Sequence, residues 1–199
     1  MDRQRLNHRS LIDRLKELDE DLALKAQREG CLACGGRLHR ADYPRRIREP
    51  GAVDGQRRAL RRISFCCDVD TCRKRMTPPS LRFLGRRQYD AVVVVLASMA
   101  VHGLKGAQVA ALSAKLGIVR TTLTRWCAWW RDTFLKSDLW NALGSQLFPP
   151  VDTQAMPRAL FERIRLQGDD RLVAMLRLVS PWGVTSSMAQ QILRSGFPR

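Results

Sequence analysis

The stretch from Val109 to Trp126, VAALSAKLGIVRTTLTRW, decides the fold of the central part of this chain. Leu112 and Leu116 lie one helical turn apart, and Gly117 can adopt the positive φ that ends a helix. A second apolar stripe begins at Leu123 and continues beyond the stretch. The spacing therefore predicts two helices joined by a tight turn. The positions that this spacing expects to be buried include Leu112, Leu116, Leu123 and either Trp126 or Cys127.

The polar residues at the start of the second helix suit contact with DNA. Arginine can bind guanine through two hydrogen bonds, and threonine can contact a thymine methyl group or a phosphate. The segment resembles the helix-turn-helix of bacterial DNA-binding proteins, which have a glycine in the turn, as Gly117 is here, and a small residue four positions earlier, as Ser113 is. The resemblance implies that the buried positions are Leu112, Leu116, Ile118, Leu123 and Trp126. It also implies DNA contacts by Arg120, Thr121, Thr122, Thr124 and Arg125. A preceding helix near residues 89–101 would complete a trihelical core, and a helical hairpin that only packs is the alternative.

Two pairs of cysteines lie upstream of this segment. Cys31 and Cys34 form a C-x-x-C motif that is followed by two glycines, and Cys67 and Cys72 enclose four residues. Two thiolates at such spacings can bind one metal ion from a tight turn, and four thiolates complete a closed tetrahedral structural site. The pattern predicts a zinc ribbon with Zn²⁺ as its cofactor. Unliganded buried cysteines are the alternative.

The third ligand of this site is either Cys66 or Cys67. In the strand that the sequence predicts here, Ile63, Phe65 and Cys67 share one face, because side chains alternate along a strand. Cys67 is therefore the favoured ligand, and Cys66 would be a spectator thiol. His39 is expected to be a strand residue that faces solvent or phosphate.

The charge of the chain favours a polyanionic partner. Among 199 residues there are 35 basic and 19 acidic ones, which gives a net charge of +16. A surplus of this size most often indicates nucleic acid. Basic residues are dense within and beside the cysteine segment, where they can contact backbone phosphate without reading sequence. The predicted phosphate contacts are Arg61, Arg62, Arg73, Lys74 and Arg75; a solvated basic face without a partner is the alternative.

The order of cysteine ribbon and helical hairpin looks like the N-terminal DNA-recognition portion of bacterial insertion-sequence transposases. Residues 65–79 are similar to the second half of their zinc ribbon, where basic residues and a Thr or Ser follow the last cysteine, and the resemblance covers roughly residues 31–134. Those transposases continue into a nuclease domain with three metal-binding carboxylates. Fewer than 70 residues follow Phe134 here, without a strand-rich pattern to position carboxylates. We therefore expect no catalytic activity.

These patterns together predict a mainly α-helical fold with a small β zinc ribbon. The expected segments are an N-terminal helix in residues 1–30, the zinc ribbon in 31–84, a trihelical helix-turn-helix domain in 85–148 and a short helical tail in 149–199. Apolar residues from Leu11 to Leu22 form one stripe on the N-terminal helix, expected from about Ser10. Packing of this stripe within its own chain is favoured over a dimerising coil, which would make a homodimer.

No apolar stretch follows the first residues, and the most apolar run, residues 91–97, is too short to span a bilayer. We therefore expect a cytoplasmic, nucleoid-associated protein without membrane contact. The expected function is recognition of double-stranded DNA by a zinc-containing protein of a mobile element, with a transposase or another mobile-element protein as a second partner. The alternative is an interaction adaptor that docks a transposase or another DNA-processing enzyme.

Overall fold

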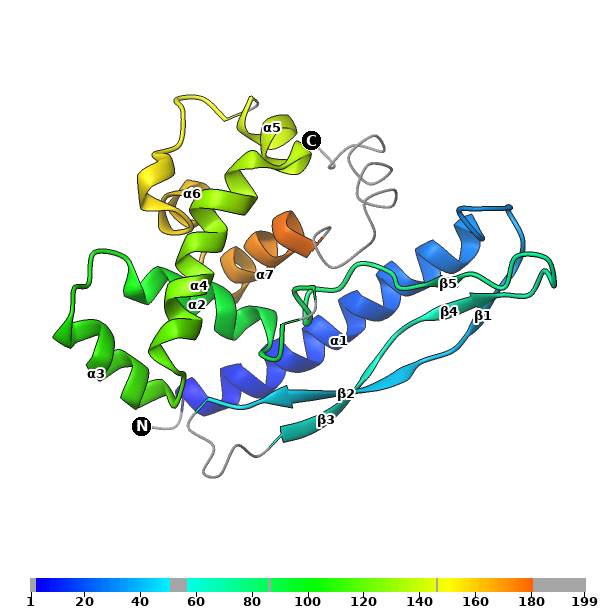
Figure 1. The fold of residues 1–199 in the computed structure, drawn as a ribbon, viewed down its shortest axis with the longest axis horizontal. Coiled ribbons are helices and arrows are strands. Elements are labelled where there is room, and N and C mark those ends of the chain that lie inside the picture. Colours follow the sequence, from blue (N-terminus) through cyan, green and yellow to red (C-terminus); the bar gives the residue numbers. More distant parts are fainter. Residues whose placement is uncertain (1–2, 51–56, 86, 146, 181–199) are drawn as a thin grey trace.

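The computed structural model describes residues 3–50, 57–85, 87–145 and 147–180 (Figure 1). Within these residues the fold is mainly helical, with two small antiparallel sheets. Helices gather at one end of the molecule, and the sheets extend away from them beside the first helix (Figure 1). The predicted class, mainly α with a small β part, is confirmed at this level.

The first helix, α1 (Arg3–Glu29), links the two ends of the molecule. It begins before the expected start at Ser10, because the preceding residues contain no Gly or Pro to interrupt a helix. Leu11 and Leu15 are buried in the core of the helical end, whereas Ala23 and Ala26 pack in a separate core with the strands. At 1.5 Å per residue such a helix is about 40 Å long. It thus belongs to both cores, and its leucine stripe packs within its own chain.

The strands form two sheets that run beside α1 (Figure 1). Three strands pair in the order β1–β4–β5: β1 (Leu38–Arg40), β4 (Phe65–Cys67) and β5 (Arg75–Met76). A second, two-stranded sheet consists of β2 (Tyr43–Arg48) and β3 (Arg57–Arg62), in which Tyr43 pairs with Arg62 and Arg48 with Arg57. Hereafter we call β2 and β3 the arginine ribbon.

The remaining described residues form the helical end. Its longer helices are α2 (Ala91–Val101), α3 (Ala107–Leu116), α4 (Arg120–Ala128) and α7 (Gly168–Val179). Its shorter ones are the π-helical turn η2 (Trp129–Thr133), the 3-10 turns η3 (Phe134–Lys136) and η4 (Thr153–Ala155), α5 (Asp138–Gly144) and α6 (Arg158–Arg163). Among the described helices, none is both long and apolar enough to cross a membrane.

One core joins α1, α2, α4 and α7. Leu15, Val94, Leu123, Trp130 and Leu176, which come from these helices and from η2, are each at most 2 % exposed. Burial of large apolar side chains is the main stabilising contribution in such a core. The described part of the expected tail, which includes α7, therefore contributes to the same core as the helices before it.

Candidate metal centre and basic surfaces

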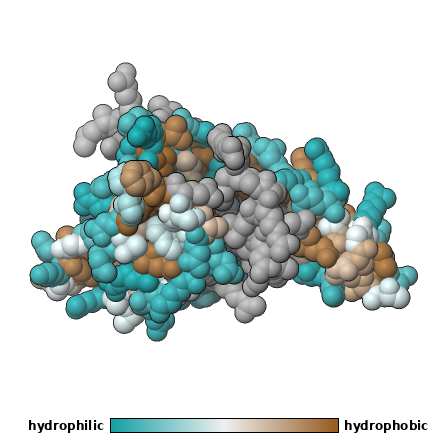
Figure 2. All heavy atoms as spheres, turned by 90° about the horizontal axis from the view of Figure 1, so that it is seen from above, coloured by the Kyte–Doolittle hydropathy of each residue, from teal (hydrophilic) through white to brown (hydrophobic). Residues whose placement is uncertain are grey.

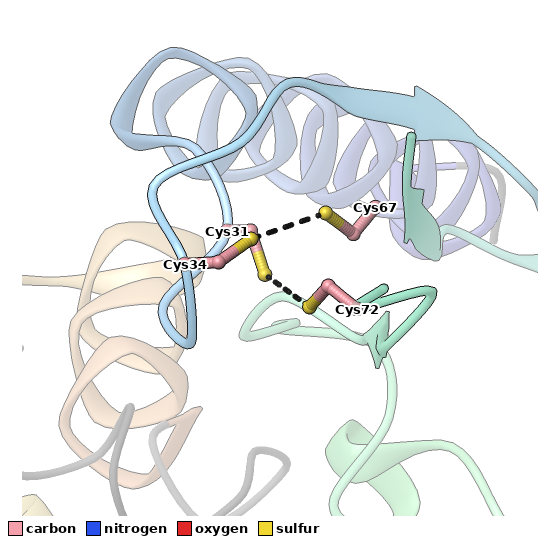
Figure 3. Close-up of side chains that lie close together, drawn as sticks. All are labelled: Cys31, Cys34, Cys67 and Cys72. Carbon is pink, nitrogen blue, oxygen red and sulfur yellow. Dashed lines mark hydrogen bonds between the residues drawn. The ribbon is translucent and has the colours of Figure 1, made fainter. Parts of the chain in front are cut away.

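Four cysteine side chains meet where the end of α1 approaches the three-stranded sheet (Figure 3). The Sγ atoms of Cys31, Cys34, Cys67 and Cys72 all lie within 4.8 Å of one another. The shortest separations are 3.7 Å between Cys31 and Cys72 and 3.5 Å between Cys34 and Cys67. A tetrahedral ion bonded to sulfur at about 2.3 Å would place the sulfur atoms about 3.8 Å apart. The cluster can therefore hold a metal ion, and all four thiols are free of disulfides.

The first pair of thiols is presented by a turn that depends on glycine. Gly30 and Gly35 have φ of +78° and +72°, in the left-handed region that other residues disfavour. The N–H of Cys31 donates to the carbonyl of Gly36 at 2.8 Å, and the N–H of Gly35 donates to the carbonyl of Cys31 at 2.7 Å. A Cβ on Gly36 would lie 3.1 Å from the Sγ of Cys67 and 2.4 Å from Val69. The second glycine of the motif thus gives the thiols room to meet.

The backbone and burial act differently on the thiols of the cluster. Hydrogen bonds from the backbone N–H of Ala33, and next from Cys34, lower the pKa of Cys31 to about 7. Burial raises the pKa of Cys67 to about 12, because its sulfur is shielded from water. A bound cation would replace the proton of Cys67, since metal ligands must be thiolates.

Cys67, and not Cys66, belongs to the cluster. The side chain of Cys67 is fully buried, and its strand partner Leu38 is buried with it. The thiol of Cys66 lies on the other face of β4, 3.6 Å from the carbonyl oxygen of Arg73. The alternation of side chains along β4 therefore separates the two neighbouring thiols, as the sequence indicated.

The surface beside the cluster is mixed in character. Exposed hydrophobic residues here include Leu32 and Val69, at 38 % and 37 %. Seen from above, hydrophobic and hydrophilic side chains are interspersed at this end of the molecule (Figure 2). His39 is exposed, and its Nε2 lies 3.4 Å from the carboxylate of Asp68. It contributes no ligand to the four-thiol cluster.

The turn between α3 and α4 has the geometry that the sequence predicts. Gly117 is left-handed, with φ of 61°. The hydroxyl of Ser113 donates to the carbonyl of Ile118 at 2.5 Å, and the N–H of Ile118 donates back to the carbonyl of Ser113 at 3.1 Å. These bonds close the end of α3 and direct the chain into α4 at Arg120. The small side chain of Ser113 thus stabilises the turn directly.

Helix α4 has one buried and one exposed face. Leu123 is fully buried, and the ring of Trp126 packs edge-on against that of Tyr89, with the centroids 5.2 Å apart. Of the predicted DNA-contacting residues, Thr122 is half-buried, and those exposed to solvent are Arg120, Thr121, Thr124 and Arg125. The hydroxyl of Thr124 donates to the carbonyl of Arg120 at 3.1 Å.

Two of the residues expected to be buried lie closer to the surface. Leu112 and Leu116 are only half-buried, and the buried residue of α3 is Val109, at 9 % exposed. The helix lies at the margin of the helical end (Figure 1), so only a narrow side of it meets α4. The buried positions of α4 and of the turn, including Ile118, are as predicted.

Arg62 is buried, unlike the other residues predicted to contact phosphate, and that prediction is wrong for it. It is 2 % exposed, donates to the carbonyl of Pro78, and lies 5.4 Å from the ring centroid of Phe83. Burial lowers its pKa to about 10. The pairing of Arg62 with Tyr43 puts it on the inner face of the arginine ribbon, so its guanidinium is not available to phosphate. The other predicted contacts, all exposed, are Arg61, Arg73, Lys74 and Arg75.

Comparison of the chain with protein families, curated proteins and solved structures found no match. Within the described residues the side chains offer one closed four-thiol cluster and several exposed arginines, both on α4 and on the strands.

Proposed function

We propose that this protein is a zinc-containing DNA-binding protein of a mobile element. It recognises double-stranded DNA through a helix-turn-helix formed by α3 and α4, and a basic zinc ribbon adds contacts to phosphate. A transposase or another protein of the element would be its second partner. The proposal assigns it no catalytic step of its own.

The exposed face of α4 is the observation that carries this proposal. Arg120 and Thr121 stand at the first turn of the helix, directly after the left-handed Gly117, while Leu123 holds the opposite side in the core. In a helix-turn-helix the first residues of the second helix reach base edges in the major groove. Here those positions offer guanidinium and hydroxyl groups, which can bind guanine and phosphate. Helix α2 packs against α4 and would be the third helix of the proposed trihelical unit.

Zinc is the metal that suits four thiolates in a closed site. Its role would be structural, because the core beneath the three-stranded sheet is small. Among the described residues, the buried hydrophobic members of that core apart from the cysteines are six: Ala23, Ala26, Leu38, Ile63, Phe65 and Met76. Small modules of this kind need an additional cross-link to stay folded.

Phosphate contacts by the zinc ribbon would come from exposed basic residues near the four-thiol cluster. Lys74 and Arg75 follow Cys72 closely, and Arg75 also lies over the ring of Tyr43, with 5.8 Å to its centroid. Arg73 is less available, because its guanidinium is bonded to the carboxylate of Asp70 at 2.5 Å. Such contacts would raise the affinity for any duplex without reading its sequence.

Fluorescence anisotropy with labelled duplex DNA tests the proposal. The wild-type protein should bind, and its affinity should fall steeply as salt rises, because each neutralised phosphate releases counterions. Arg120→Ala and Arg125→Ala should each lose about 1–3 kcal/mol of binding free energy on a selected duplex if they contact bases. A matched control is Arg177→Ala on α7, which is exposed and should bind as the wild type does.

Absence of duplex binding by zinc-loaded wild-type protein would refute the proposal. If Arg120→Ala and Arg125→Ala both keep the wild-type affinity for the selected duplex, the assignment of α4 as the recognition helix is refuted. A partner protein that binds tightly with little dependence on salt would instead favour an interaction adaptor, since hydrophobic docking is only weakly salt-dependent.

A further inference from the structure

The arginine ribbon has two chemically different faces. Opposite residues of an antiparallel pair share a face, and exposure alternates along both strands. The inner face includes Ile47, which is fully buried, and Arg62. The outer face is formed by Pro44, Arg46 and Arg48 of β2 and by Arg57, Ala59 and Arg61 of β3. Within these described strands the outer face therefore carries four arginines and no acidic residue.

Two acidic groups near the ribbon, Glu49 and Asp90, bind to its inner face. Arg58, whose strand partner is Ile47, lies 3.0 Å from the carboxylate of Glu49 and 2.9 Å from that of Asp90. On the outer face Arg46 and Arg57 are exposed, and the small side chain of Ala59 lies directly opposite Arg46. A small residue at this position lets extended guanidinium groups reach a partner while the backbone stays close to it.

The ribbon is held in a fixed position relative to α4. The N–H of Arg48 donates to the carbonyl of Gln88 at 2.6 Å, and Arg58 bonds Asp90, the residue that precedes α2. Tyr89, which lies between Gln88 and Asp90 in the sequence, packs on Trp126 of α4. In Figure 1 the ribbon and the first turn of α4 both lie along the lower side of the molecule.

We propose that the outer face of the arginine ribbon enters the major groove of the duplex and reads guanines there, as a second sequence-reading element beside α4. This inference rests on the proposed function. The major groove, about 12 Å wide, admits a two-stranded β-ribbon, and there each base pair presents a distinct pattern of donors and acceptors, whereas the pattern in the minor groove is degenerate. The two strands of the ribbon lie about 4.8 Å apart and fit that width. Arg46, Arg57 and Arg61 supply the bidentate donors, and Ala59 suits contact with a thymine methyl group.

Arginine-to-lysine substitution separates base reading from attraction to phosphate. Lysine keeps the charge but lacks the rigid planar fork that holds O6 and N7 of guanine in one geometry. The probes are a duplex recovered by the wild-type protein from a random-sequence pool and a scrambled duplex of the same composition. The discrimination ratio is the affinity for the first divided by that for the second. Arg46→Lys with Arg57→Lys should lower this ratio about 5-fold or more for each lost guanine contact, while affinity for the scrambled duplex stays near the wild-type value.

A charge-matched control removes two exposed arginines elsewhere. Arg165→Ala with Arg177→Ala should leave the discrimination ratio unchanged, whereas Arg46→Ala with Arg57→Ala should lower both the ratio and the affinity for the scrambled duplex. An unchanged ratio in both ribbon variants, together with a reduced ratio in Arg120→Ala, would overturn the inference and leave the proposed function standing. Failure of the wild-type protein to bind any duplex would overturn both.

Discussion

The carboxylate of Asp19, in the middle of α1, accepts a hydrogen bond from Nε of Arg82 at 2.9 Å, although Asp19 is only 1 % exposed. The same carboxylate accepts the hydroxyl of Ser80 at 2.6 Å and the N–H of Leu81 at 2.7 Å. These bonds attach α1 to the segment that leads from the three-stranded sheet into α2. They hold the two ends of the molecule in one arrangement, as the proposed binding of the arginine ribbon and α4 to one duplex requires.

Removal of the Asp19 carboxylate should therefore destabilise the whole fold. Asp19→Ala leaves Arg82, 13 % exposed, and the hydroxyl of Ser80 without their charged partner in a buried site. Breaking one side of such a pair costs about 3 kcal/mol or more. Urea denaturation followed by circular dichroism measures the loss. Glu17→Ala, at an exposed position on the same helix, is the control and should change stability by less than about 0.5 kcal/mol. Equal stability of the two variants would contradict the role of Asp19.

The two neighbouring cysteines of β4 should respond in opposite ways to replacement by serine. Cys67→Ser removes a sulfur from the four-thiol cluster, so the purified protein should contain little metal and the three-stranded sheet should lose stability. Cys66→Ser changes a thiol on the other face and should retain the metal content of the wild type. Elemental analysis of both proteins measures this difference. Full metal content in Cys67→Ser, or its loss in Cys66→Ser, would contradict the assigned ligands.

Gly36 should tolerate no side chain if the thiols are to meet. The Cβ of Gly36→Ala would approach Cys67 and Val69 too closely, and we expect the affinity for zinc to fall about tenfold or more. Competition with a chromophoric chelator measures it. Adding Val69→Ala should recover only part of the loss, because the contact with sulfur remains. Leu32→Ala, an exposed change within the same turn, should keep the wild-type affinity. An unchanged affinity for zinc in Gly36→Ala would show that the turn can accommodate a side chain at this position, and would contradict the prediction.

The features that sequence predicts here are those set by local spacing. The C-x-x-C motif with its glycines identifies a turn that could hold a metal ion, because chelation depends on residues a few positions apart. The period of the apolar residues around Gly117 likewise identifies α3, the turn and α4. For the same reason the alternation in β4 is enough to choose Cys67 over Cys66.

The features that sequence does not predict depend on contacts between distant segments. Asp19 and Ser80 are 61 positions apart, and no motif marks either of them. The inner position of Arg62 also follows from strand pairing, since a row of arginines shows no apolar alternation to indicate which face is buried. The helical tail expected in residues 149–199 gives no sign that α7 completes the central core, because burial there depends on distant segments such as α2.

Cross-linking from the first turn of α4 tests the central claim most directly. A photoreactive phenylalanine analogue replaces Thr121, which is exposed at this turn, or Arg177, which is exposed on α7. Each protein is irradiated with a duplex that the wild-type protein selects from random sequence. We predict efficient cross-links from position 121, confined to a few adjacent base pairs, and none above background from position 177. Equal labelling from both positions, or none from position 121 while the duplex remains bound, would contradict the claim that α4 faces the DNA.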